Sequence, residues 1–244
     1  MGDKRLLYDR ASRVRGYDQA ALENSHIGMV GAGGLGGEVA HGLVRKGIGA
    51  LTISDFDAVA VSNLQRQFFM KDDVGVNKAF ALARNLTCHA TGVTQISAFS
   101  VPFQDAINHP QFVSPDVMVV GVDNNPTRIA ASAYCLEYRI PAVFLAVDQH
   151  ASKGAVFVQE VGADQPCFVC YDPNAPADNR VFECAGSSIE ILKATAGITL
   201  YAIDSLLMNR HRSWHVKDVF FNDPDGARRI AKRATCRVCG GANS

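Results

Sequence analysis

Net charge, long apolar runs and an apolar N-terminal segment are all missing from this sequence. Its 24 lysines and arginines balance its 24 aspartates and glutamates, so net charge indicates neither nucleic acid nor an anionic membrane as a partner. No apolar stretch is long enough to span a bilayer, and the first residues, MGDKRLLYDR, lack the apolar core of a signal peptide. We therefore expect a cytoplasmic protein that binds neither membranes nor nucleic acids.

The sequence also has no internal repeat, no low-complexity tract and no evident linker. Its 244 residues suit one domain with a single sizeable core. We expect this domain to consist of a first part over 1–148 and a second over 149–244. Basic residues cluster at 4–15 and 228–233, and we expect the second cluster to be a solvated surface.

Short apolar runs alternate with helical patterns in the first part. They predict strands at 27–30, 51–54, 93–96, 117–121 and 142–145, and helices at 35–46, 78–86 and 128–138. Because parallel strands need crossover connections, this alternation predicts a Rossmann-like, mainly parallel sheet with helices on both faces. The second part predicts an antiparallel strand at 154–159, a polar loop at 166–183, a helix at 189–208 capped by Ser187 or Ser188, and a strand at 216–221.

A glycine-rich loop lies between the first predicted strand and its helix. Glycines in such a loop let the backbone turn tightly and approach phosphates, which bind the N–H groups of the helix start. Asp55 ends the next strand, at the spacing expected for an acid that binds ribose hydroxyls. The pattern indicates a nucleotide without specifying which, and alone it fits an NAD-dependent oxidoreductase best. The glycines are Gly31, Gly33, Gly34 and Gly36.

Polar residues follow the second strand and favour ATP over a dinucleotide. An enzyme that cleaves ATP between its α- and β-phosphates must stabilise the departing pyrophosphate, and fixed cations with a metal ion do this. Each residue alone is compatible with ordinary surface polarity, but together they lie beyond the carboxyl ends of strands, where ligands bind in open sheets. They are Asp57, Asn63, Arg66, Gln67 and Lys78.

Asp123 and Asn124 follow the strongest predicted strand and face the same crevice. One well-placed carboxylate with substrate phosphates is enough to bind Mg²⁺, so Asp123 is the candidate magnesium ligand. The alternative is that Asp123 caps the following helix.

Two CxxC pairs stand far apart, Cys167 with Cys170 and Cys236 with Cys239. Four thiolates form a closed, tetrahedral and therefore structural Zn²⁺ site, and a redox dithiol is the alternative. We expect Cys88 and Cys135 to be buried apolar residues. The seventh, Cys184, precedes a helix start that would lower its pKa, so it is either a nucleophile or a loop residue without chemistry.

Taken together, these segments resemble the ThiF/MoeB/HesA group, bacterial relatives of the ubiquitin-activating enzymes. The similar segments are Tyr8-Asp9-Arg10, GAGGLG, DFDAVAVSNLQRQ, GVNK, VDNN, both CxxC pairs and the Cys184 loop. The resemblance implies a homodimer that binds ATP, Mg²⁺ and the Gly-Gly tail of a small β-grasp protein, either ubiquitin-like or a sulfur carrier. The tail carboxylate then attacks the α-phosphate, which yields an acyl-adenylate and pyrophosphate.

The resemblance also implies roles for individual residues. Gly33 and Gly34 would approach the phosphates, Asp55 would hold the ribose and Asp123 would position Mg²⁺. Arg10 would reach the partner protomer's site as an arginine finger. Cys184 would carry a thioester or a persulfide. The phosphates would be surrounded by Asn63, Arg66, Gln67 and Lys78, and structural zinc would be bound by Cys167, Cys170, Cys236 and Cys239.

Two segments depart from the pattern of this group. After Cys184 the sequence lacks the usual valine and proline, and 146–150 lacks the small-residue run expected beside a Gly-Gly tail. A different peptide or protein acceptor, in a conjugation or defence system, is therefore a second hypothesis, and a non-catalytic nucleotide-binding scaffold is a third. An oxidoreductase is disfavoured because no suitable catalytic His or Tyr–Lys arrangement is evident.

Overall fold

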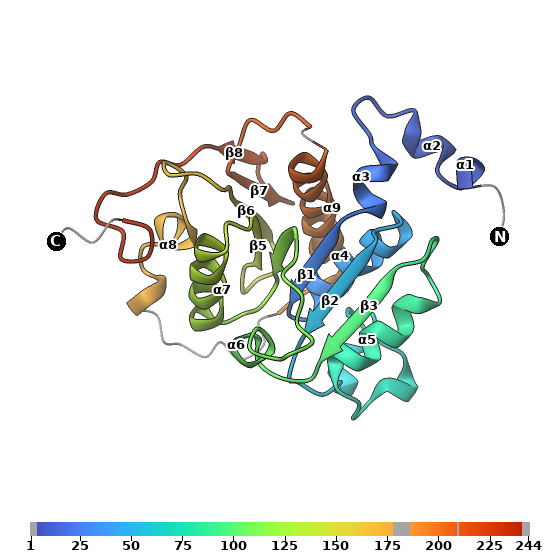
Figure 1. Cartoon of the computed structure of the whole chain (residues 1–244). Helices are drawn as coiled ribbons and strands as arrows, with labels where there is room; N and C mark the ends of the chain where they lie inside the picture. Colours follow the sequence, from blue (N-terminus) through green and yellow to red (C-terminus); the bar gives the residue numbers. More distant parts are fainter. Residues whose placement is uncertain (1–3, 178–185, 209, 241–244) are drawn as a thin grey trace.

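The computed structural model describes residues 4–177, 186–208 and 210–240, and its elements form one open sheet with helices on both faces (Figure 1). In spatial order the strands are β3 (Gln95–Phe99), β2 (Ala50–Ser54), β1 (His26–Val30), β4 (Val117–Val120), β5 (Ala142–Val147), β6 (Lys153–Gln159), β7 (Val216–Phe220) and β8 (Gly226–Arg228). The first five are parallel to one another, and the pairs β5–β6, β6–β7 and β7–β8 are antiparallel. The predicted fold class is confirmed.

Two layers of helices cover the sheet, because side chains alternate between its faces along each buried strand. In β4, Val117 and Val119 join one core while Met118 and Val120 join the other. The first face carries α4 (Gly34–Arg45), α5 (Lys78–Thr87) and α9 (Ile189–Leu207). The second carries α6 (Phe103–Ala106), α7 (Asn125–Glu137) and α8 (Phe168–Tyr171). None of the described helices has the length and apolar character needed to cross a membrane.

Short helices and turns complete the chain. Figure 1 shows the N-terminal α1 (Lys4–Leu7) and α2 (Asp9–Ser12) extending beyond α3 (Gln19–Glu23), which leads into β1. Within the described residues, three 3₁₀ turns lie in connections, at η1 (Val61–Asn63), η2 (Lys71–Asp73) and η3 (Ala175–Ala177).

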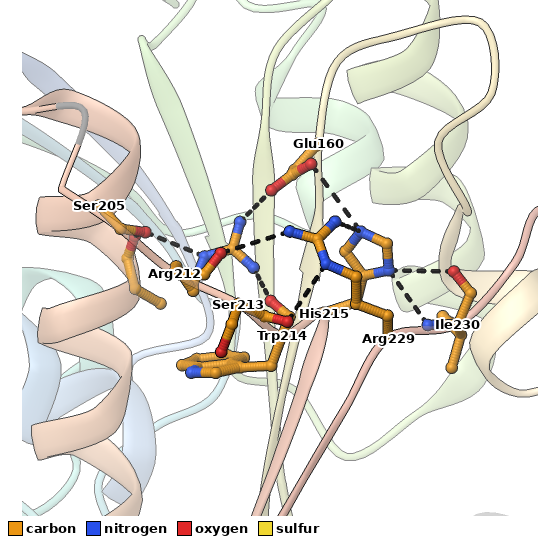
Figure 2. Close-up of polar contacts among 9 residues, drawn as sticks. Glu160, Ser205, Arg212, Ser213, Trp214, His215, Arg229 and Ile230 are labelled. Atoms are coloured by element: carbon orange, nitrogen blue, oxygen red, sulfur yellow. Dashed lines mark hydrogen bonds and ion pairs between the residues drawn. The ribbon is translucent and has the colours of Figure 1, made fainter.

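A polar cluster, buried at Arg212 and exposed at Arg229, fastens the antiparallel strands to the end of α9 (Figure 2). Arg212 donates to the Ser205 hydroxyl at 3.0 Å and also binds the Glu160 carboxylate and the Trp214 carbonyl. Arg229 donates to the Ser213 carbonyl at 3.2 Å. Since each charge has partners, the cluster can hold β6, β7 and the C-terminal chain together without an uncompensated buried ion.

The second basic cluster is only partly the solvated surface that its sequence predicts. Arg228 and Arg229 are exposed, but Arg228 forms an ion pair with the buried Asp218 carboxylate. Lys232 donates to the Ala163 carbonyl at 2.7 Å. These contacts anchor the chain on its way to the last cysteine pair.

Candidate active site

A cavity of about 360 Å³ lies beyond the carboxyl ends of four neighbouring strands. The segment after each of these strands contributes a residue to the cavity lining: Asp55 after β2, Gly31 after β1, Asp123 after β4 and Asp148 after β5. Between β1 and β4 the chain connections leave in opposite directions. This is the switch point at which open α/β sheets bind ligands.

The glycine loop forms the floor of this cavity. Gly31 has a φ of 96°, which favours glycine, and a Cβ on Gly36 would lie 2.0 Å from the Gly31 carbonyl oxygen. Gly33 is the N-cap of α4 and offers no capping side chain, so the first N–H groups of the helix are available to an anion. Gly31, Gly33 and Gly34 line the cavity, whereas Gly36 does not; it permits the tight turn.

Asp55 fastens the end of β2 to this loop. Its carboxylate accepts the Ala32 N–H at 2.7 Å and the Asp57 N–H at 2.9 Å. Burial raises the pKa of Asp55, against the effect of these two hydrogen bonds. Beside it, the Lys78 ammonium lies 2.8 Å from the Asp57 carboxylate. The predicted acid and cation therefore share one end of the cavity.

The segment after η1 contributes two more lining residues. The Arg66 guanidinium donates to the Ser62 carbonyl at 2.8 Å, and Arg66 is only 9% exposed. The Gln67 side-chain oxygen is buried without a hydrogen-bond partner among the described residues, which is typical of a group that binds a ligand or water. Asn63 does not line the cavity; its side chain accepts the Ala60 N–H at 2.9 Å and holds the turn that presents Arg66.

Asp123 lines the cavity and is exposed. The capping role considered for it belongs to Asn124, whose side chain accepts the Thr127 N–H at 2.9 Å. In the described part of the chain, the Asp123 carboxylate forms no hydrogen bond or ion pair of its own. Carboxylate oxygen is a ligand that Mg²⁺ prefers, so Asp123 fits a metal that also touches ligand phosphates.

Arg128 is a cavity residue that the sequence analysis missed. It lies half-buried in the first turn of α7, and its guanidinium donates to Asn125 at 3.2 Å. Burial lowers its pKa, and the nearby Asp123 charge opposes this effect. Helical side chains lean toward the helix N-terminus, and the N-terminus of α7 lies at the cavity. An arginine in the first turn of a helix that follows a strand could therefore have been predicted to line the cavity.

Asp148 and Gln149 line the opposite end of the cavity, together with Ser187. The Asp148 carboxylate accepts the Ser152 N–H and the Lys153 N–H, both at 2.8 Å, and the Ser152 hydroxyl at 2.7 Å. Burial raises the pKa of Asp148, but these hydrogen bonds outweigh burial and lower it overall. This end therefore carries a fixed, ionised carboxylate.

The four paired cysteines come together on the second face of the sheet, away from the cavity lining. Their Sγ atoms all lie within 4.8 Å of one another, with 3.5 Å from Cys167 to Cys236 and 3.4 Å from Cys170 to Cys239. Tetrahedral zinc–thiolate bonds of about 2.3 Å place sulfurs roughly 3.8 Å apart. The cluster thus fits Zn²⁺ bound by four thiolates, an arrangement that leaves no position for substrate.

Other predicted residues lie elsewhere. Arg10 is on α2 with a side chain 89% exposed, and it does not line the cavity of its own chain. Cys184 lies outside the described residues. Cys135 is buried as predicted. The prediction for Cys88 was wrong, because α5 ends at Thr87 and Cys88 is its exposed C-cap.

The fold is that of the doubly wound α/β class, whose open sheets bind ligands at the switch point where this cavity lies. More particularly, the model of the ThiF family matches residues 8–242, and the chain belongs to this family.

Similar curated proteins carry the names of activating enzymes. The chain is 30% identical over 238 residues to "Adenylyltransferase and sulfurtransferase MOCS3" of Caenorhabditis briggsae, an alignment covering 91% of this chain and 56% of that protein. It is 30% identical over 228 residues to the "SAMP-activating enzyme E1" of Haloferax volcanii, covering 91% and 83%. The chain thus spans little more than half of the first relative's length.

Solved structures share the fold. E. coli MccB in complex with ATP has a TM-score of 0.77 at 21% identity, covering 91% of this chain and 68% of that one. E. coli MccB with MccA-N7isoASN has a TM-score of 0.81 at 19% identity, covering 98% and 75%.

Proposed function

We propose that the protein uses ATP to adenylate the C-terminal carboxylate of a small protein or peptide and releases pyrophosphate. The observation that carries this proposal is the convergence in one cavity of an uncapped helix start, three cationic side chains and the unpaired Asp123 carboxylate. The names of the relatives include adenylyltransferase and activating enzymes, and a neighbour of the same fold is a complex with ATP.

We assign a task to each part of the cavity. Asp55 would bind the ribose, and the phosphates would lie across Gly33 and Gly34 at the start of α4. An acceptor carboxylate oxygen attacks the α-phosphorus, and the bond to the bridging oxygen breaks with its electron pair leaving on pyrophosphate. Arg66 and Lys78 would stabilise that developing charge. Asp123 would hold Mg²⁺, which supplies further neutralisation of the phosphates.

We assign the remaining groups as follows. The cysteine cluster binds structural Zn²⁺ and fixes the C-terminal chain against α8, in a cytoplasm that keeps thiols reduced. The protein acts as a homodimer in which Arg10 of each protomer serves the other's phosphates, which accounts for its distance from its own cavity. The Cys184 thiolate attacks the acyl-adenylate and forms a thioester as AMP leaves, or it accepts the outer sulfur of a donor persulfide, which is left as a thiol.

Two acceptors deserve testing. The relatives' names, which include a ubiquitin-like modifier-activating enzyme and an adenylyltransferase and sulfurtransferase, favour a ubiquitin-like or sulfur-carrier protein, and for such an acceptor we propose a Gly-Gly tail. The charged and polar side chains at the β5 end of the cavity, Asp148 and Gln149, favour an acceptor whose last residue is larger than glycine. One solved structure of the same fold holds E. coli MccB together with MccA-N7isoASN.

The proposal is tested by trapping the acyl-adenylate. The protein is incubated with ATP, Mg²⁺, candidate acceptors and hydroxylamine, and the acceptor is analysed by mass spectrometry. A hydroxamate at the acceptor's C-terminus, absent without ATP and in an Asp123→Ala variant, is the expected result. Unmodified acceptors together with an absence of ATP binding would refute adenylation.

A further inference from the structure

The cavity has two chemically different ends. Asp55 follows β2 and Asp148 follows β5, three strand spacings away, which is about 14 Å. Lys78 and Arg66 follow β2, and the glycine loop follows β1. If adenylation proceeds as proposed above, the nucleotide fills the β2 side, and the β5 end is left for the last residue of the acceptor.

Asp148 is preorganised at that end. Two backbone N–H groups and the Ser152 hydroxyl fix its carboxylate, so the side chain needs no rearrangement to bind a ligand. Each carboxylate oxygen can accept more than one hydrogen bond, so the two oxygens of Asp148 can still accept a hydrogen bond from a ligand. The side chain of Gln149 forms no hydrogen bond with the described residues and lies beside it in the lining.

No fixed cation pairs with Asp148, and the charge that acts on its carboxylate from the neighbouring chain is that of His150, which titrates near neutral pH. Asp57, at the other end, has Lys78 at 2.8 Å, whereas no Lys or Arg of the described chain lies within 4.0 Å of the Asp148 carboxylate. Arg128 also lines the cavity, but the carboxylates that act on its charge are those of Asp123 and Asp172. A Gly-Gly tail would add a further negative charge near Asp148 and no side chain to compensate it.

We infer that the acceptor's C-terminal residue carries a cationic side chain, lysine or arginine, which pairs with the carboxylate of Asp148. This inference rests on the proposed adenylation and decides between its two acceptors. The nucleotide's phosphates and the attacking carboxylate are all anionic, so a cation at the β5 end both selects the acceptor and lowers the electrostatic cost of bringing these groups together.

Stable analogues of the adenylate test this without a known acceptor. The probes are 5′-O-sulfamoyl adenosines carrying Nα-acetyl-lysyl, Nα-acetyl-norleucyl or Nα-acetyl-glycyl groups, and their Kd values are measured by calorimetry. The norleucyl probe has the lysine stem without its ammonium. The Asp148→Asn variant keeps a side-chain oxygen for the loop hydrogen bonds but removes the charge. Asp18→Asn is the matched control, because Asp18 accepts two backbone N–H groups outside the cavity.

The expected result is that the lysyl probe binds at least about tenfold more tightly than the other two, as a charge-assisted contact implies. Asp148→Asn should abolish this preference without weakening the glycyl probe, and Asp18→Asn should leave it intact. Equal binding of all three probes, or a lysyl preference that survives Asp148→Asn, would overturn the inference while leaving adenylation standing. Failure of all three probes to bind, with ATP still binding, would overturn adenylation and this inference with it.

Discussion

Replacing Gly36 by alanine tests the glycine loop through its tightest contact. The new Cβ would lie 2.0 Å from the Gly31 carbonyl oxygen, whereas ordinary van der Waals contact begins at 3.4 Å, so the loop and α4 must separate by more than 1 Å. Overpacking of this kind costs about 1–3 kcal/mol, and the better helix propensity of alanine returns up to about 1 kcal/mol. We expect a net loss of about 1–2 kcal/mol in the free energy of unfolding.

The same displacement moves Gly33 and Gly34, which line the cavity. ATP affinity should therefore fall at least about tenfold, since the N–H groups no longer meet the phosphates. Gly197→Ala is the matched control, because Gly197 lies in α9 with no atom within 4 Å of its added Cβ. That variant should gain about 0.8–1 kcal/mol and bind ATP normally.

Urea unfolding of both variants measures the free energy of unfolding, and calorimetric titration with ATP measures the affinity. If Gly36→Ala is as stable as Gly197→Ala and binds ATP equally well, the steric account of the loop is wrong.

Three further predictions follow from other parts of the structure. One zinc per chain should be found by elemental analysis, and Cys170→Ser should lose it while Cys135→Ser keeps it; equal zinc in both variants would contradict the assigned cluster. Burial lowers the pKa values of His26, His41 and His215, so the unfolded chain binds more protons than the folded chain below pH about 6.5. The urea concentration at the unfolding midpoint should therefore decrease when the pH is lowered from 7.5 to 5.5, and it should decrease less in His215→Gln. A midpoint that increases as the pH is lowered would refute this prediction. Arg128→Gln should slow adenylation at least about tenfold, because it removes a half-buried cation from the cavity, with zinc content unchanged; wild-type rates would make Arg128 a structural residue only.

Strand and helix alternation was sufficient to predict the sheet, because buried parallel strands leave apolar runs that few other structures produce. The structure places Asp55 and Asp123 in one cavity for the same reason: carboxyl ends of parallel strands share an edge. The strand β8 was missed since Gly226–Arg228 has no apolar alternation. Helix α8 was expected as loop, and its four residues begin directly after the N-cap Cys167, where the cysteine spacing rather than a helical pattern sets the conformation.

The role of each residue in the site was harder to predict than which residues belong to the site. Asn63 stands in the segment DFDAVAVSNLQRQ that carries the family resemblance, yet its side chain holds a turn, because a motif does not distinguish a ligand contact from the support behind it. Arg128 was missed because its approach to the cavity depends on the direction of a helical side chain. Asp148 follows β5 at the edge that the pattern did predict, but its fixed orientation comes from hydrogen bonds with Ser152 and Lys153 that the sequence does not specify.

Exchange of labelled pyrophosphate into ATP tests the central claim most directly. The purified protein is assayed with Mg²⁺ and two sets of acceptors, Gly-Gly proteins and peptides ending in lysine, beside the Asp123→Ala variant. Adenylation predicts exchange that requires an acceptor and is lost in Asp123→Ala. A protein that binds ATP but supports no exchange with either set, or exchanges equally well without Asp123, would contradict the account.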